Sequence, residues 1–115
     1  MNGKLLTTIA QPELSGTAQL ARLFPDVQPV GPPCLLRLSG PGSVGFREVV
    51  AVEFSGTEKA IFTAALPLEF EDRVRLENDR GQGMEALVIA VQYQHGKTAV
   101  AVQILDTPSA WIKRP

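Results

Sequence analysis

Hydrophobic and polar positions alternate in several short stretches of the chain, and these stretches predict β-strands. Val74 and Leu76 alternate with charged neighbours between residues 72 and 77. Period-two alternation directs one set of side chains to a buried face and the other to solvent. The pattern therefore predicts a half-buried strand over residues 72–77.

A similar pattern covers the middle of the chain. Phe46, Val50, Val52 and Phe54 would share one face of a strand, with Glu48 as the exception. A strand with such a face packs its apolar side chains on a core. We therefore expect a second half-buried strand here.

Two later stretches, Met84–Gln92 and Lys97–Leu105, are apolar on both faces, as strands covered on both sides tend to be. A tight hairpin connection containing glycine separates them. Shorter apolar stretches at residues 34–38 and 60–65 bring the number of expected strands to six. Six strands at short, regular spacing predict an all-β fold, a six-stranded antiparallel barrel.

Residues 1–33 have a different character and predict a short N-terminal helical or extended segment. Apolar residues recur at near-helical spacing over Glu13–Phe24, although Gly16 disfavours a helix by up to about 1 kcal/mol relative to alanine. Pro25–Pro33 has the composition of an extended linker. We therefore expect the barrel domain, with its C-terminal tail, to span residues 34–115.

Composition narrows the classes of function. A chain of 115 residues predicts one domain, and a net charge of −1 gives no basic field to bind a nucleic acid polymer. One cysteine and one histidine provide neither an internal disulfide nor a metal site of the zinc-cluster kind. No stretch approaches the roughly 18 consecutive apolar residues of a membrane span, and the N-terminus lacks a signal-peptide pattern. We expect a cytoplasmic protein without membrane insertion.

The stretch from Glu53 to Glu58, followed by an apolar strand, resembles the signature of the PilZ domain family, Asp/Asn-x-Ser-x-x-Gly. Ser55 occupies the serine position, Glu53 the acidic position and Glu58 the glycine position. The order of the later strands and turns extends the resemblance from Cys34 to Trp111. PilZ domains are small β-barrels known as receptors for the bacterial second messenger cyclic di-GMP. The resemblance implies that fold, and it implies ligand-binding positions at Glu53, Ser55 and Glu58.

Departures from the family pattern imply weak or absent nucleotide binding. Ligand-binding members carry an Arg-x-x-x-Arg motif just before the first barrel strand, and its guanidinium groups hold phosphate and guanine bidentately. Pro25–Cys34 contains no arginine. A carboxylate at Glu58 would also repel a doubly anionic ligand. Candidate phosphate contacts are Arg22, Arg37 and Arg47. Arg47, Arg73 and Arg75 could form part of a phosphate-facing patch, but exposed charges are also ordinary on a barrel surface.

The residues suggest no catalytic constellation, so we do not expect an enzyme. The resemblance implies a degenerate PilZ-like signalling or adaptor module in cyclic di-GMP-type regulation, with another protein as its partner and no cofactor. Two alternatives stay open. The chain could be a genuine receptor that uses non-standard arginines to bind cyclic di-GMP as a regulatory ligand, or a structural subunit of a larger assembly.

Overall fold

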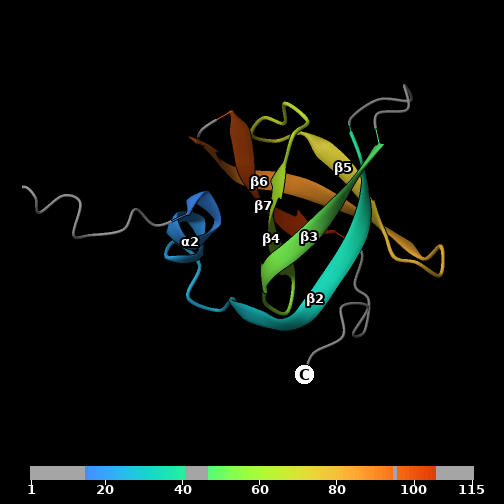
Figure 1. Ribbon diagram of the computed structural model, residues 1–115, viewed down its shortest axis with the longest axis horizontal. Helices are drawn as coiled ribbons and strands as arrows, with labels where there is room; N and C mark the ends of the chain where they lie inside the picture. The colour runs from blue at the N-terminus through green and yellow to red at the C-terminus, as the bar shows by residue number, and fades with distance from the viewer. Residues whose placement is uncertain (1–14, 41–46, 95, 106–115) are drawn as a thin grey trace, which may run out of the picture.

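The structure, a computed structural model, describes residues 15–40, 47–94 and 96–105 of the chain. One short helix and six strands make up this part of the protein (Figure 1). In chain order they are α2 (Gly16–Ala21), β2 (Gln28–Ser39), β3 (Arg47–Ser55), β4 (Lys59–Ala64), β5 (Arg73–Glu77), β6 (Gly83–Gln94) and β7 (Lys97–Ile104). The expected all-β fold is confirmed.

The six strands close into an antiparallel barrel in the order β2-β3-β4-β7-β6-β5. Consecutive strands pair within two groups, β2-β3-β4 and β5-β6-β7. The groups are joined where β4 pairs with β7 and β2 pairs with β5, two pairings between strands distant in the sequence. Closure of this kind gives strands hydrogen-bond partners on both sides and removes the edges of an open sheet.

Inward-facing side chains fill the barrel with a continuous apolar core. Leu38, Phe62 and Leu76 are fully buried, with 0% of each exposed. Burial of such a side chain contributes about 1.5–3 kcal/mol to stability. The alternation in β5 is as expected, because Val74 and Leu76 are buried whereas Arg73 and Arg75 are exposed.

Glu48 interrupts the apolar face of β3 for a structural reason. Its Oε2 accepts a hydrogen bond of 2.7 Å from the N–H of Ala65, and its Oε1 accepts one of 3.1 Å from the N–H of Leu66. The carboxylate thereby satisfies two main-chain donors where the chain leaves β4. The exception in the pattern is thus a side chain that fixes the exit from a neighbouring strand.

A second apolar cluster lies on the outside of the barrel beneath α2. Leu20 of the helix is 3% exposed and belongs to a cluster with Ile61 of β4 and Ala101 of β7. α2 lies against β4, β6 and β7, as Figure 1 shows. Because β7 has the barrel interior on one face and α2 on the other, its sequence is apolar on both faces.

Two register shifts change which residues face outward. The β3–β4 register shifts between Val52 and Phe54, and the β6–β7 register shifts between Val88 and Ala90. An extra residue in one strand reverses the faces of the residues that follow. Phe54 therefore packs in the outer cluster, not with Val52 in the barrel, and the single face expected for β3 is wrong at this residue.

The helix is shorter than expected. α2 spans Gly16–Ala21, within the predicted Glu13–Phe24, whose first two residues lie outside the described part. Ser15 is its N-cap, and its Oγ accepts a hydrogen bond of 3.1 Å from the N–H of Ala18. Within the described ranges, no helix is both long and apolar enough to cross a membrane.

The proline-rich segment is partly a barrel strand. β2 begins at Gln28, before the expected strand start at Cys34. Its pairing with β3 is interrupted between Pro29 and Cys34, and its pairing with β5 involves only residues 37–39. Proline has no N–H to donate, and a stretch with few ladder partners tolerates it. The proline-rich composition predicted a linker. The strand depends on long-range pairing with β3, where Gln28 lies opposite Ser55, and composition does not reveal such pairing.

Candidate functional site

The three residues at the positions compared with the PilZ signature lie around the connection between β3 and β4. Glu53 and Ser55 are at the end of β3, and Glu58 immediately precedes β4. The start of β2 lies alongside, with Gln28 opposite Ser55. The segment between α2 and β2 borders the same connection through Asp26. The structure therefore brings all three signature positions to one end of the barrel.

Ser55 faces the barrel interior. The register shift in β3 places it opposite Ala60, which is a fully buried member of the barrel core. Ser55 itself is 9% exposed. A hydroxyl in this position has little access to a ligand in solvent, which fits a structural role at the end of the strand.

Glu53 links β3 to the start of α2. The Oγ1 of Thr17 donates a hydrogen bond of 2.6 Å to Oε1 of Glu53. Thr17 is 1% exposed, and its Oγ1 also lies 3.1 Å from Oγ of Ser15. Since each hydroxyl has one proton, Ser15 is the donor in that second bond. The carboxylate thus ends a chain of hydrogen bonds that begins at the N-cap of the helix.

Glu58 forms two hydrogen bonds with β7. Its Oε1 accepts a hydrogen bond of 3.0 Å from Nε2 of Gln103, and its main-chain oxygen accepts one of 2.7 Å from the N–H of Ile104. Glu58 is not among the described residues with positive φ. Its backbone therefore has no need of glycine, and the glutamate is accommodated without strain at the position where the family pattern has glycine.

Gly56 allows the segment before β2 to lie against the connection. A Cβ at Gly56 would lie 3.0 Å from the main-chain oxygen of Asp26 and 3.0 Å from its Oδ2. Asp26 also forms an ion pair with Lys59, whose Nζ lies 3.3 Å from Oδ2. The same Nζ lies 5.9 Å from the centre of the Phe24 ring. Protein groups therefore occupy the space on this side of the connection.

The charges around the connection are mainly negative. Glu53, Glu58 and Asp26 contribute carboxylates, and Lys59 contributes an ammonium group that is already paired with Asp26. An anion brought to this end of the barrel would meet like charges at short range. The local electrostatics therefore disfavour a doubly anionic ligand.

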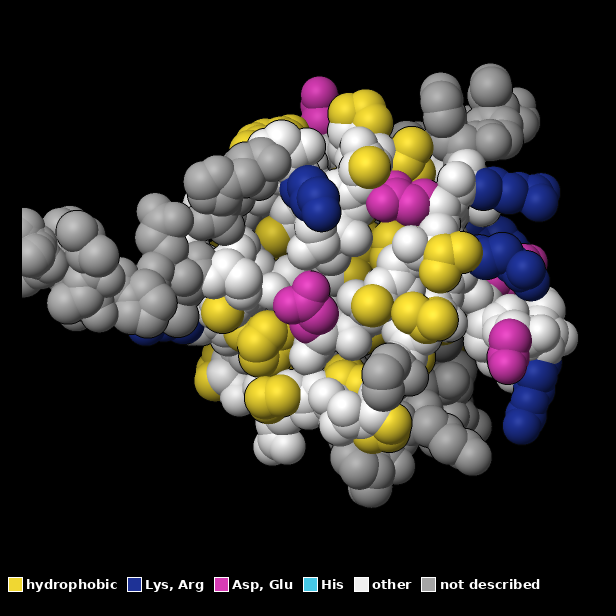
Figure 2. All heavy atoms as spheres, viewed as in Figure 1, with side chains coloured by type: hydrophobic (Ala, Val, Ile, Leu, Met, Phe, Trp, Pro, Cys, Tyr) yellow, Lys and Arg dark blue, Asp and Glu magenta, His cyan; other side chains and the backbone are white. Residues whose placement is uncertain are grey.

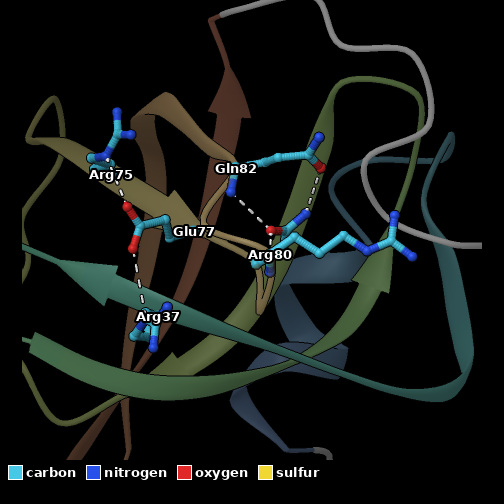
Figure 3. Close-up of polar contacts among 6 residues, drawn as sticks. Arg37, Arg75, Glu77, Arg80 and Gln82 are labelled. Carbon is cyan, nitrogen blue, oxygen red and sulfur yellow. Dashed lines mark hydrogen bonds and ion pairs between the residues drawn. The ribbon is translucent and has the colours of Figure 1, made fainter.

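Arg37 and Arg47 lie towards the other end of their strands. Arg37 is opposite Val49, and Arg47 is the first residue of β3, whereas Ser55 is the last. At a rise of about 3.3 Å per residue, these positions are roughly 20 Å and 26 Å from Ser55 along the strand. Arg37 is also engaged elsewhere, since its Nε lies 3.6 Å from Oε1 of Glu77 (Figure 3).

Arg22 lies at the end of α2, on another element than Arg37 and Arg47. It is the C-cap of α2; its main-chain N–H donates to the carbonyl oxygen of Gln19 at 3.3 Å, and the N–H of Leu23 donates to that of Leu20 at 2.9 Å. The side chain of Arg22 is exposed. With Arg37 and Arg47 near the opposite strand ends, the three arginines do not form one guanidinium cluster around the connection.

Cys34 has no sign of activation. Burial raises the pKa of the Cys34 thiol, so the reactive thiolate is disfavoured. Among the described residues, no group of three or more histidine, cysteine, aspartate or glutamate side chains is placed to hold a metal ion.

Four contacting residues at this end were not singled out from the sequence: Thr17, Asp26, Lys59 and Gln103. The two partners in the Thr17–Glu53 bond are 36 residues apart, and no local pattern indicates such a pair. Gly56 was the one available signal, because a glycine inside a motif often marks a close approach of two chain segments.

No family model matches this chain, and no curated protein or solved structure matches it significantly.

Proposed function

We propose that this chain is a degenerate PilZ-like signalling or adaptor module that works through protein contacts and does not depend on cyclic di-GMP. The observation that carries the proposal is the use of all three signature positions within the protein itself. Ser55 faces the barrel interior, Glu53 accepts a hydrogen bond from α2, and Glu58 accepts one from β7. The signature thus stabilises the fold where a receptor would use it for a ligand.

The architecture is compatible with this proposal. The closed barrel of six antiparallel strands is the fold that the resemblance implied, with the signature at the β3–β4 connection. A barrel of this kind that does not bind a nucleotide still offers several rigid outer faces to another protein. The carboxylates of Asp26, Glu53 and Glu58 supply the physical reason for weak nucleotide affinity.

Calorimetric titration of the full chain with cyclic di-GMP tests the proposal. We expect no binding up to about 100 μM ligand, which corresponds to a binding free energy weaker than about −5.5 kcal/mol. A Glu58→Gly variant removes one carboxylate and restores the family residue, and Glu58→Gln removes the charge alone. Nucleotide binding by Glu58→Gly but not by the natural chain would show that the natural sequence has lost a receptor function.

The receptor alternative predicts a different result. Micromolar binding by the natural chain, with loss of affinity in Arg22→Ala, Arg37→Ala or Arg47→Ala, would establish a receptor with an unconventional phosphate contact and would refute the proposal. Arg80→Ala is a matched control, because Arg80 is exposed in the β5–β6 turn and is not a candidate contact.

A further inference from the structure

The outer face of β2, β3 and β5 combines exposed apolar and basic side chains. Residues directly opposite one another on paired strands point to the same face of the sheet. By this register, Arg37 lies beside Val49 on one side and Glu77 on the other. We call this surface the β2–β3–β5 face and define it by six outward-facing residues: Leu35, Arg37, Arg47, Val49, Arg75 and Glu77.

Two large aliphatic side chains of this face are exposed to solvent. Leu35 is 60% exposed and Val49 is 62% exposed. They are diagonal neighbours on paired strands, a spacing of about 7–8 Å between Cα atoms. α2 lies mainly against β4, β6 and β7, and no other described helix is available to cover the β2–β3–β5 face. A solvent-facing strand surface is ordinarily polar, so adjacent exposed aliphatic side chains here indicate a contact surface.

The face is basic within a chain whose net charge is −1. Arg37 and Arg75 lie beside the carboxylate of Glu77, and Arg47 lies opposite Ser39 on β2. The carboxylate of Glu85 borders the face, opposite Arg75 on β6. The Nε atoms of Arg37 and Arg75 lie 3.6 Å and 3.7 Å from Oε1 and Oε2 of Glu77 (Figure 3), and the guanidinium group of Arg75 also lies against Gly83. A guanidinium group that pairs through Nε can still donate from its terminal nitrogens, so Arg37 can pair with a further acidic group. Within the described ranges, no carboxylate lies within ion-pair distance of Arg47. Figure 2 shows arginine and lysine side chains gathered on the side where β2, β3 and β5 meet, with hydrophobic side chains beside them.

Closure of the barrel limits how a partner can bind here. The β2-β5 and β2-β3 pairings occupy the main chain of β2 at Arg37–Ser39, so a partner cannot add a strand at this point. It must contact side chains on the face. The protein already binds one helix in this way, because α2 packs Leu20 on the outward-facing Ile61 and Ala101. Three neighbouring strands span about 10 Å, which is close to the diameter of a helix.

We infer that the β2–β3–β5 face is the docking site for an acidic amphipathic helix of a protein partner. The apolar stripe of the helix covers Leu35 and Val49, and its carboxylates pair with Arg37, Arg47 and Arg75. This inference rests on the proposed function, since it names the surface through which the adaptor would act.

Two other classes of anionic partner fit the face less well. Single-stranded nucleic acids are bound by aromatic side chains that stack on bases, and the six residues of the face include none. Anionic membrane surfaces attract clusters of basic residues, but here Glu77 lies between two of the three arginines. A carboxylate-bearing helix can accommodate Glu77 by leaving a neutral residue opposite it.

Fluorescence anisotropy with the full chain tests the inference directly. The probe is a fluorescein-labelled helical peptide of about 18 residues, with leucine at positions i, i+3, i+4 and i+7 among glutamates. Comparison probes are the same peptide with lysine for glutamate, a single-stranded DNA oligonucleotide of equal charge, and vesicles containing phosphatidylserine. We expect the acidic peptide to bind best, with affinity that falls as salt is raised from 50 to about 300 mM.

Matched variants locate the binding site. Arg47→Glu and Val49→Thr should each weaken peptide binding by about fivefold or more, a factor that corresponds to roughly 1 kcal/mol. Both positions are exposed, and threonine keeps the β-branched shape of valine, so circular dichroism should show an unchanged fold. Lys97→Glu and Leu23→Thr are equivalent changes at exposed positions outside the face and should alter affinity by less than about twofold.

The outcomes separate this inference from the proposed function. Preference for the DNA or the vesicles, absence of peptide binding, or equal effects of the control variants would overturn the docking site. That result would leave the proposed function intact, because an adaptor that acts without cyclic di-GMP could contact its partner through another surface. Micromolar cyclic di-GMP binding in calorimetry would instead refute the proposed function. The peptide titrations would still test, independently, whether the β2–β3–β5 face binds an acidic helix.

Discussion

Glu71 has an unfavourable backbone conformation, and its replacement by glycine should stabilise the protein. Its φ is 75°, and it is the one non-glycine residue with positive φ in the described part of the chain. A residue with a Cβ loses about 1–2 kcal/mol in this conformation because the Cβ approaches a main-chain carbonyl. Two hydrogen bonds hold the turn against β6: the N–H of Glu71 to the oxygen of Val88 at 2.8 Å, and the N–H of Val88 to the oxygen of Asp72 at 2.9 Å.

Glu71→Gly removes this clash and retains both main-chain hydrogen bonds. Glycine also increases the conformational freedom of the unfolded chain, which offsets about 0.5–1 kcal/mol of the gain. The Glu71 side chain is exposed, so little packing is lost. We expect a net increase of about 1 kcal/mol in the free energy of unfolding, equivalent to a Tm increase of about 4 °C for a chain of this size.

Thermal and urea denaturation followed by circular dichroism would measure the change. Glu71→Ala removes the carboxylate but keeps the Cβ, so its stability should stay within about 0.5 kcal/mol of the natural chain. Glu69→Gly is the same substitution at an exposed residue whose φ is not positive, and it should lose about 0.5 kcal/mol. The reasoning fails if Glu71→Gly is no more stable than Glu71→Ala, or if Glu69→Gly gains as much.

Three further predictions concern the packing around the barrel. Gly56→Ala should lower the free energy of unfolding by about 1 kcal/mol in urea denaturation, because its Cβ would lie 3.0 Å from two oxygens of Asp26; unchanged stability would mean that this segment shifts freely. Thr17→Val removes the donor to Glu53 and should cost about 1 kcal/mol, but less in a Glu53→Ala background, which has no acceptor; equal costs in this double-mutant cycle would exclude the coupling. Burial raises the pKa of Cys34 above its ordinary 9.0, so its reaction with a thiol reagent at pH 8 should be slower in the folded than in the urea-unfolded chain. The contribution of the Cys34 thiol to the free energy of unfolding is fully present below its pKa in the unfolded chain and is lost as pH rises through its pKa in the folded chain. A free energy of unfolding that rises over this pH range, after correction for other groups, would contradict the raised pKa of Cys34.

Much of the barrel could be predicted because its signals are local. In β5, apolar residues alternate with charged ones, and the strand Arg73–Glu77 lies within the predicted residues 72–77. In β7, the apolar residues on both faces predicted a strand covered on both sides, and α2 with the barrel interior provides that cover. Side-chain alternation and turn residues act within a few positions of the chain, so the sequence displays them directly.

The candidate site was predicted less completely. The signature positions Glu53, Ser55 and Glu58 do lie together, because they are close in sequence at the end of one strand. Their contacts come from distant residues such as Thr17 and Gln103, which no local pattern connects with them. The direction of Ser55 depends on a register shift between two strands, and such a shift reverses faces without changing the composition of either strand.

The amino-acid sequence by itself determined most of the strand positions, the inward direction of Val74 and Leu76 in β5, the cover on both faces of β7, and that the signature lacks its glycine and its arginine pair. These properties follow from residue identity and short-range periodicity. Only the tertiary structure decided that Gln28–Pro33 is part of a strand, that Phe54 packs outside the barrel, and that Arg37 and Arg47 lie far from Ser55. Each of these outcomes depends on which strands meet and in what register, and that is settled by long-range pairing and burial.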